Sequence, residues 1–277
     1  MKSDKKKIEN RTLPFKKWVS EQSKSSSKFL PLTHITLARF ARDILSDGRI
    51  EPRSCKVLGR AVAYFFYGRA AYRVGGDETV STESRLPICF ILKSDLIRQS
   101  NDVYPFDSGA FEGSLYKDYM GHEFQLSDFS LAGEPLLPNQ LISTAYPSLE
   151  DYVSGNSENI VDPDEVSNRG DFEVQAYLKL INSEGSNTPD DRVGSIEVLF
   201  SDAVEIKDNL VCAIVPHTLM APKLGAQWPK EQEDKGVKIL TYEFLPKRRP
   251  EYFQAEIEKL FRDFCKERGL FEEGGEE

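Results

Sequence analysis

The chain has 277 residues, of which 39% are hydrophobic and 11% aromatic, enough for one large domain to bury a sizeable core. A formal net charge of -9 argues against a protein wrapped in nucleic acid over much of its surface, although it is compatible with a local basic groove. No apolar run approaches the roughly 18 residues of a membrane span, and no apolar segment follows the N-terminal lysines as in a secretory signal. We therefore expect a cytoplasmic protein with no membrane contact.

Metal chemistry is not expected from the side chains available. The four cysteines, Cys55, Cys89, Cys212 and Cys265, are far apart and have no metal-ligand spacing. Cys89 and Cys212 lie in apolar, strand-like runs, which is typical of reduced and buried thiols. With only three histidines in the chain, we predict no metal site.

The N-terminal residues 1–28 are predicted to form a basic flexible arm. Residues 1–17 carry seven Lys or Arg against two acids, and the serine-rich run that follows has little apolar surface to bury. Phe15 and Trp18 are the exceptions and could dock the arm. The lysines fit either a solvated tail or a binding arm.

Regular structure is expected to begin at Phe29. Leu30 to Ile35 is predicted to be a short strand, and Thr36 is placed as the N-cap of a helix. That helix has an apolar face at i, i+3, i+4, i+7 and i+8 from Leu37, and Gly48 is predicted to end it.

The middle of the chain alternates apolar runs with irregular segments. Ala61 to Tyr67 is an aromatic β-like run, and Leu86 to Leu92 reads as a buried strand. Tyr104 to His122 has no clean period and is predicted to be a structured loop. Leu136 to Ser143 is expected to be a short element, and residues 150–170 an acidic flexible loop.

The C-terminal part is predicted to contain four strands and one helix. Phe172 to Leu180 alternates apolar and polar residues, and further strands are expected at Arg192–Ser201, Leu210–Pro216 and Lys238–Phe244. A packed helix should begin at Pro250, run along an apolar stripe and end at Gly269.

These elements predict a mixed α+β fold. We expect a single domain over residues 29–269, with an inserted loop region at about 104–170 and an acidic tail at 270–277.

Several familiar catalytic motifs are absent from the sequence. It has no P-loop, no G-x-G-x-x-G fingerprint, no G-x-S-x-G elbow and no H-E-x-x-H. One unusual feature is Glu197 between Ile196 and Val198, because an unpaired buried carboxylate is costly. It could instead face solvent on an alternating strand or pair with a buried arginine.

The order of three motifs resembles the ADP-ribosyltransferase fold, most closely the DarT-type toxins and more loosely the PARP group. The motifs are the H-x-T of His34 to Thr36, the aromatic run from Tyr64 leading into Arg69, and the strand Ser195–Phe200 around Glu197. The likeness covers residues 29–92 and 172–216. It departs from the DarT pattern after Arg69, where Ala-Ala-Tyr replaces Ser/Asn-Pro-Met.

The resemblance implies an ADP-ribosyltransferase-like fold of two small packed antiparallel or mixed sheets with flanking helices, with NAD as substrate in the cleft between the sheets. It implies that His34 and Thr36 hold the ribose on the adenosine side. A ring from Tyr64, Tyr67 or Tyr72 would stack on the nicotinamide.

Two charged residues complete the implied site. Arg69 would clamp the NAD phosphates or the catalytic carboxylate, and Glu197 would stabilise the oxocarbenium-like state and orient or deprotonate the acceptor. Glu173 is the second carboxylate considered.

The acceptor remains open between nucleic acid, DNA or RNA, and protein. The resemblance also implies a toxin or defence role and an antitoxin or regulatory partner. The alternatives are a non-catalytic interaction module with the same fold, and an NAD glycohydrolase.

Overall fold

A computed structural model describes residues 13–22, 28–72, 79–156, 161–167, 170–182, 192–220 and 228–271. The fold is α+β, with one mixed sheet and helices beside it. The strands are β1 (Leu32–Leu37), β2 (Arg49–Ile50), β3 (Arg53–Cys55), β4 (Arg60–Tyr67), β5 (Pro87–Leu92), β6 (Asp102–Tyr104), β7 (Glu197–Phe200), β8 (Val204–Glu205), β9 (Leu210–Pro216) and β10 (Lys238–Tyr242). The α-helices are α1 (Pro14–Ser20), α2 (Ala38–Asp47), α3 (Ser108–Glu112), α4 (Leu137–Ala145), α5 (Leu149–Ser154), α6 (Pro163–Ser167), α7 (Phe172–Ile181), α8 (Trp228–Asp234) and α9 (Pro250–Glu267).

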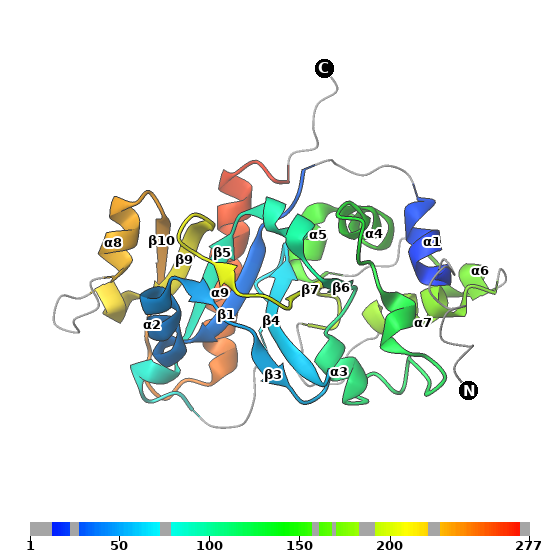
Figure 1. The fold of residues 1–277 in the computed structure, drawn as a ribbon, viewed down its shortest axis with the longest axis horizontal. Helices are drawn as coiled ribbons and strands as arrows, with labels where there is room; N and C mark the ends of the chain where they lie inside the picture. Colours follow the sequence, from blue (N-terminus) through cyan, green and yellow to red (C-terminus); the bar gives the residue numbers. More distant parts are fainter. Residues whose placement is uncertain are drawn as a thin grey trace, which may run out of the picture.

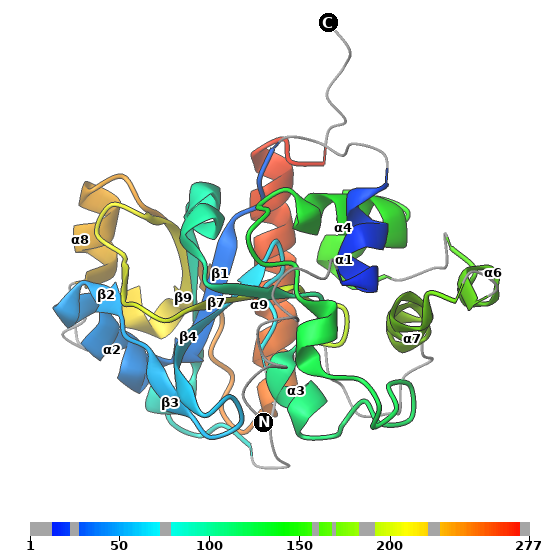
Figure 2. The same cartoon turned by 45° about the vertical axis from the view of Figure 1, so that its right-hand side comes forward.

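The main sheet has the strand order β10-β9-β5-β1-β4-β7-β6, with β3 paired to β4. Its neighbours are antiparallel except for β9 and β10, which are parallel. In Figure 1, α1, α4, α6 and α7 gather on the β6–β7 side of the sheet, and α2 and α8 lie on the opposite side. Figure 2 shows α9 standing upright beside the sheet.

The expected pair of packed sheets is therefore replaced by one main sheet and a separate two-stranded pair, β2 and β8. The reason lies in the central strands. Strand β1 pairs with β5 on one side and β4 on the other, and β4 also pairs with β7, so the two halves share one hydrogen-bonded ladder.

Several elements lie where the sequence predicts them. Strands β4, β5, β9 and β10 coincide with the predicted runs to within two residues at each end, and α9 follows the stripe from Pro250. Gly48 ends α2 in the left-handed conformation, with φ +74° and its N–H donated to Ile44 O.

The prediction of a strand at Phe172–Leu180 is wrong, because this segment is helix α7. The apolar residues Val174, Tyr177, Leu178 and Ile181 also stand at i, i+3, i+4 and i+7, and all four are buried. Counting Tyr177 as a solvent-facing residue produced the apparent alternation; as a core residue, it completes a helical stripe.

Thr36 does not cap helix α2 as predicted. Strand β1 continues to Leu37, and Thr36 pairs with Ile88 in the β1–β5 ladder. The first helical N–H, from Ala38, is satisfied by the carbonyl of Leu86 at 2.8 Å. Because a backbone carbonyl already serves this donor, the helix begins one residue beyond the strand without a side-chain cap.

The predicted loops at 104–170 contain short helices. Helix α3 lies in the first of them, and α5 and α6 lie in the acidic segment, where Ser148 caps α5. Residues 157–160 and 168–169 lie outside the described part. Within the part of the chain that is described, no helix is long and apolar enough to cross a membrane.

The predicted arm, whose residues 1–12 and 23–27 lie outside the described part, contains helix α1, which belongs to the core. Phe15 and Val19 are fully buried and Trp18 is 8% exposed. The Phe15 ring lies edge-on to Phe129 at 5.4 Å and to Tyr177 at 5.3 Å between ring centroids.

We expect Phe15→Ala to lower the free energy of unfolding by about 3–5 kcal/mol, because it leaves a cavity among these rings. Urea denaturation measures the change. The control is Lys17→Ala on the exposed side of the same helix, for which a change within about 0.5 kcal/mol is expected. A loss below about 1 kcal/mol for Phe15→Ala would show that α1 is only loosely docked.

Candidate functional site

Strands β1, β4 and β7 are adjacent and bring distant parts of the sequence into one row. Thr33 pairs with Phe66, and Phe66 pairs with Glu197. On its other side Glu197 pairs with Tyr104 of β6. The H-x-T segment and the Glu197 strand therefore lie on the two sides of the aromatic strand.

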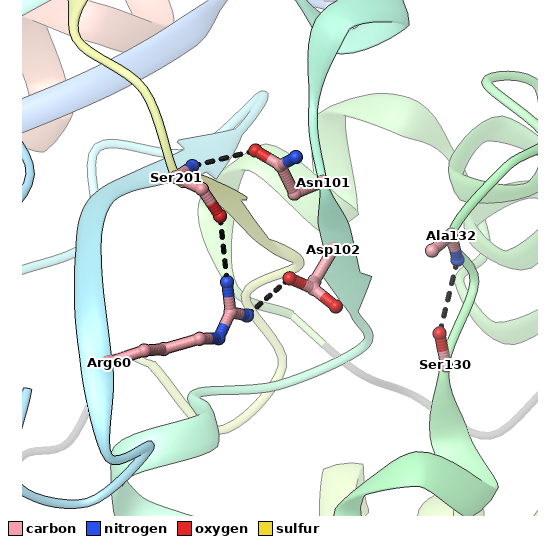
Figure 3. A network of polar contacts seen from close by, with 6 residues as sticks. All are labelled: Arg60, Asn101, Asp102, Ser130, Ala132 and Ser201. Carbon is pink, nitrogen blue, oxygen red and sulfur yellow. Dashed lines mark hydrogen bonds and ion pairs between the residues drawn. The ribbon is translucent and has the colours of Figure 1, made fainter.

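The register of β4, β7 and β6 is fixed at the far end of β7. Figure 3 shows Arg60 reaching across from β4, with its guanidinium bonded to Ser201 at 2.9 Å and ion-paired with Asp102. The backbone N–H of Ser201 donates to Asn101 at 2.6 Å. A slip of one residue would move the Glu197 side chain to the other face of the sheet. These contacts therefore help to keep its carboxylate on the face that its paired residue Phe66 shares.

The His34 side chain bonds to β4 just beyond the last residue pair of the β1–β4 ladder, Thr33 and Phe66. Its Nδ1 lies 2.8 Å from the carbonyl oxygen of Tyr64. A carbonyl only accepts, so Nδ1 carries the proton. Burial lowers the pKa of His34, and the nearby Arg53 lowers it further. The ring is therefore neutral, which leaves Nε2 as a hydrogen-bond acceptor.

His34, Thr36 and Tyr64 line one cavity of about 140 Å³ between α2, the β2–β3 segment and β4. Arg53 also lines it and lies over the ring of Phe40 at 4.6 Å. Arg53 has no carboxylate within ion-pair distance in the described ranges. Three of the predicted NAD-contacting residues thus share a cavity whose lining carries two arginines, Arg49 and Arg53, and three acids, Asp43, Asp47 and Glu51.

Glu197 is the first residue of β7, not a mid-strand residue as predicted, because residues 192–194 form a turn. It is 1% exposed. The backbone N–H of Ser108 donates to its Oε2 at 3.1 Å. Burial raises the pKa of Glu197 to about 8; the charge of Asp107 adds to the rise, and Ser108 and Arg192 oppose it.

Asp107 and Arg192 form a buried ion pair beside Glu197. Arg192 Nη1 lies 2.6 Å from Asp107 Oδ2, and the two side chains are 9% and 7% exposed. Asp107 also caps α3, since its Oδ1 accepts from Ala110 N at 2.6 Å. One arginine thus serves two neighbouring carboxyl groups. The raised pKa leaves Glu197 mostly protonated at neutral pH.

The raised pKa of Glu197 makes stability depend on pH. The folded state holds this proton from the ordinary pKa of 4.5 up to about 8, while the unfolded state has already released it. The Glu197 contribution is therefore complete below about pH 4.5 and is lost as the pH rises towards 8, at up to about 1.4 kcal/mol per pH unit.

We expect the free energy of unfolding of the wild type to fall relative to that of Glu197→Gln between pH 5 and 8. Urea denaturation of both proteins at several pH values measures this difference. Parallel pH dependences would contradict the protonated state of Glu197.

Tyr64 connects the cavity to the carboxyl pair. Burial raises the pKa of its phenol most. A hydrogen bond with the Cys55 thiol and the charges of Glu197 and Asp107 raise this pKa further. Burial alone would raise the pKa of Cys55, but hydrogen bonds from Tyr64 and the backbone outweigh it and lower that pKa. Of the predicted aromatic residues, Tyr64 thus both lines the His34 cavity and interacts electrostatically with Glu197 and Asp107.

Arg69 lies apart from Glu197. It is 8% exposed, and its guanidinium lies over the Tyr152 ring at 5.9 Å. Gly155 has φ +75°, the left-handed region that favours glycine, and a Cβ there would lie 2.6 Å from Nη2 of Arg69. Arg69 does not clamp Glu197; the arginine beside the carboxyl pair is Arg192.

The remaining predicted residues have other surroundings. Tyr67 is fully buried; it donates to Asn139 at 2.6 Å and accepts from Leu30 N at 3.0 Å, so it is a core residue. Tyr72 is partly buried, and burial raises its pKa. Glu173 lies in the first turn of α7, not on a strand.

Sequence reasoning missed Asp107, Ser108 and Arg192. The one available signal was Asp107-Ser108 before a short helix, which is typical of an N-cap. Among the described residues, no group of three or more His, Cys, Asp or Glu is placed to hold a metal ion. No protein-family model, curated protein or solved structure matches this chain.

Proposed function

We propose that this protein is an NAD-dependent ADP-ribosyltransferase with an ADP-ribosyltransferase-like fold. The observation that carries the proposal is the β1–β4–β7 row, in which the strands of His34, Tyr64 and Glu197 are hydrogen-bonded neighbours. The motif order alone did not require this adjacency.

In the proposed reaction, the bond between nicotinamide and ribose breaks through an oxocarbenium-like state. The carboxylate of Glu197 would stabilise the positive charge and orient the acceptor. The ring of Tyr64 would contact the nicotinamide. His34 Nε2 would accept a hydrogen bond from a ribose hydroxyl, because Nδ1 is already used by Tyr64 O.

The Asp107–Arg192 pair would tune Glu197. Burial, and secondly the charge of Asp107, raise the pKa of Glu197 and keep its proton at neutral pH in the free protein, while a bound nicotinamide cation would favour the carboxylate. Substrate binding would therefore ionise the residue that the reaction needs.

The acceptor, the biological role and the compartment belong to the same proposal. A nucleic acid or a protein accepts ADP-ribose, the protein acts as a toxin or defence effector, and an antitoxin or regulatory partner restrains it. A cytoplasmic site of action is supported by the four free cysteines.

The experiment is incubation with NAD labelled in the adenylate part, with and without cell lysate, followed by nuclease or protease treatment. Nicotinamide release with label on nucleic acid or protein supports a transferase and identifies the acceptor class. Release without labelled macromolecule indicates an NAD glycohydrolase. If no arm shows nicotinamide release or label transfer, the enzyme proposal is refuted.

A specific observation favours the non-catalytic alternative. Glu197 is 1% exposed, and neither the His34 cavity nor the cavity beside Arg69 is lined by it. Catalysis thus requires the Asp107–Ser108 segment to open, whereas an interaction module requires no such movement. NAD binding without nicotinamide release would support the module.

A further inference from the structure

A second cavity, of about 210 Å³, lies between the end of β4, helix α5 and helix α9. It is lined by Arg69, by Val153 and Ser154 of α5, and by one face of α9. None of the residues of the β1–β4–β7 row lines it. What it can bind follows from the charges that face it.

Among the described residues, Arg69 is a buried cation that has no anionic partner. It is 8% exposed, and in the described part of the chain its guanidinium has no carboxylate within ion-pair distance and no hydrogen-bond acceptor. Burying an uncompensated charge is costly. Gly155 leaves room for the group, since a Cβ there would lie 2.6 Å from Nη2, and a Cβ on Gly194 would lie 3.6 Å from Nη1.

Helix α9 adds two more cations at helical spacing. Ala255, Glu258, Lys259 and Arg262 stand at i, i+3, i+4 and i+7 and line the cavity, while the apolar stripe of α9 packs in the core. Lys259 and Arg262 form no ion pair with a described residue. Glu258 is the only acid among the described lining residues, and it accepts from Gln254 Nε2 at 2.9 Å.

Among the described lining residues, three cations, of which Lys259 and Arg262 are exposed, therefore stand against one carboxylate. A single carboxylate ligand would leave this excess only partly neutralised, whereas a diphosphate brings a negative charge on each phosphate and many acceptor oxygens. Arginine binds phosphate through its planar fork of donors, and lysine binds it as a point charge.

We infer that this cavity is a binding site for a diphosphate group and that α9 supplies two of its three cations. That NAD supplies this diphosphate rests on the proposed function. Free nucleoside diphosphates carry the same group, and the experiment separates the two sources.

The test is isothermal titration of the full chain with inorganic pyrophosphate, without divalent metal. One saturable site is expected, and Lys259→Gln/Arg262→Gln should weaken it by about tenfold or more. Lys266→Gln removes one positive charge, half as many as the double variant, from α9 outside the cavity and should leave binding within about twofold. No saturable binding, or equal loss in the control, would overturn the inference. Because these variants lie on the exposed side of α9, folding should be kept, which thermal unfolding checks.

Nicotinamide release from the same samples separates this inference from the proposed function. Pyrophosphate binding that depends on α9 in a protein that releases no nicotinamide overturns the enzyme proposal alone. If nicotinamide is released and the α9 variants bind pyrophosphate as tightly as the wild type, this inference alone is overturned. Pyrophosphate that raises the KM for NAD without changing kcat supports NAD as the source, and a fall in kcat alone rejects it.

Discussion

Glu197→Gln is expected to lower the rate of nicotinamide release from NAD by about 100-fold to 1,000-fold. Glutamine keeps the shape and can still accept from Ser108 N, but it cannot supply the negative charge that opposes the oxocarbenium-like state. The loss should therefore appear in kcat more than in KM. The control is Glu205→Gln, at an exposed position of strand β8, which should retain full activity.

The pH profile of the wild type gives an independent view of the same residue. Because burial and Asp107 raise the pKa of Glu197 to about 8, the active carboxylate is the minor form at neutral pH. The value of kcat/KM should rise about tenfold per pH unit below this pKa and level off above it. Equal activity of Glu197→Gln and the wild type would contradict the catalytic role of this carboxylate.

Arg192→Leu is expected to lower the free energy of unfolding by about 3–5 kcal/mol at pH 7. Arg192 is the cation beside Asp107 and Glu197, and its side chain is 9% exposed. Its removal takes away the ion-pair partner of the buried Asp107 carboxylate, which lies next to a second carboxyl group. Urea denaturation measures the loss.

The matched control is Arg42→Gln, which breaks a surface ion pair of 3.2 Å between side chains that are 80% and 57% exposed. Such a pair contributes little, so a change within about 0.5 kcal/mol is expected. A loss below about 1 kcal/mol for Arg192→Leu would show that Asp107 finds another partner or takes up a proton instead.

Local pattern was sufficient where one element carries one clear period. The apolar stripe of α9 and the β-like runs of β5 and β9 are strong enough to be read directly. Helix α7 failed because its buried residues fit both an alternating and a helical pattern, and only Tyr177 decides between them. The packing of Phe15 against Tyr177 is the tertiary contact that makes the difference.

The candidate site was predictable only in part, for a different reason. A carboxylate in an apolar run marks Glu197, and H-x-T marks His34. The residues that set the chemistry of Glu197 come from elsewhere: Asp107 and Arg192 are 85 positions apart, and neither belongs to a motif. The sequence could not show that Arg69 lines another cavity, which Glu197 does not line.

The most direct test of the central claim is a crystal structure of the protein with bound NAD or a non-hydrolysable analogue. The account predicts the nicotinamide ribose beside the Glu197 carboxylate, with the nicotinamide against Tyr64, a ribose hydroxyl at His34 Nε2 and the Asp107–Ser108 segment displaced. NAD bound away from the β1–β4–β7 row, with Glu197 still enclosed, would contradict it.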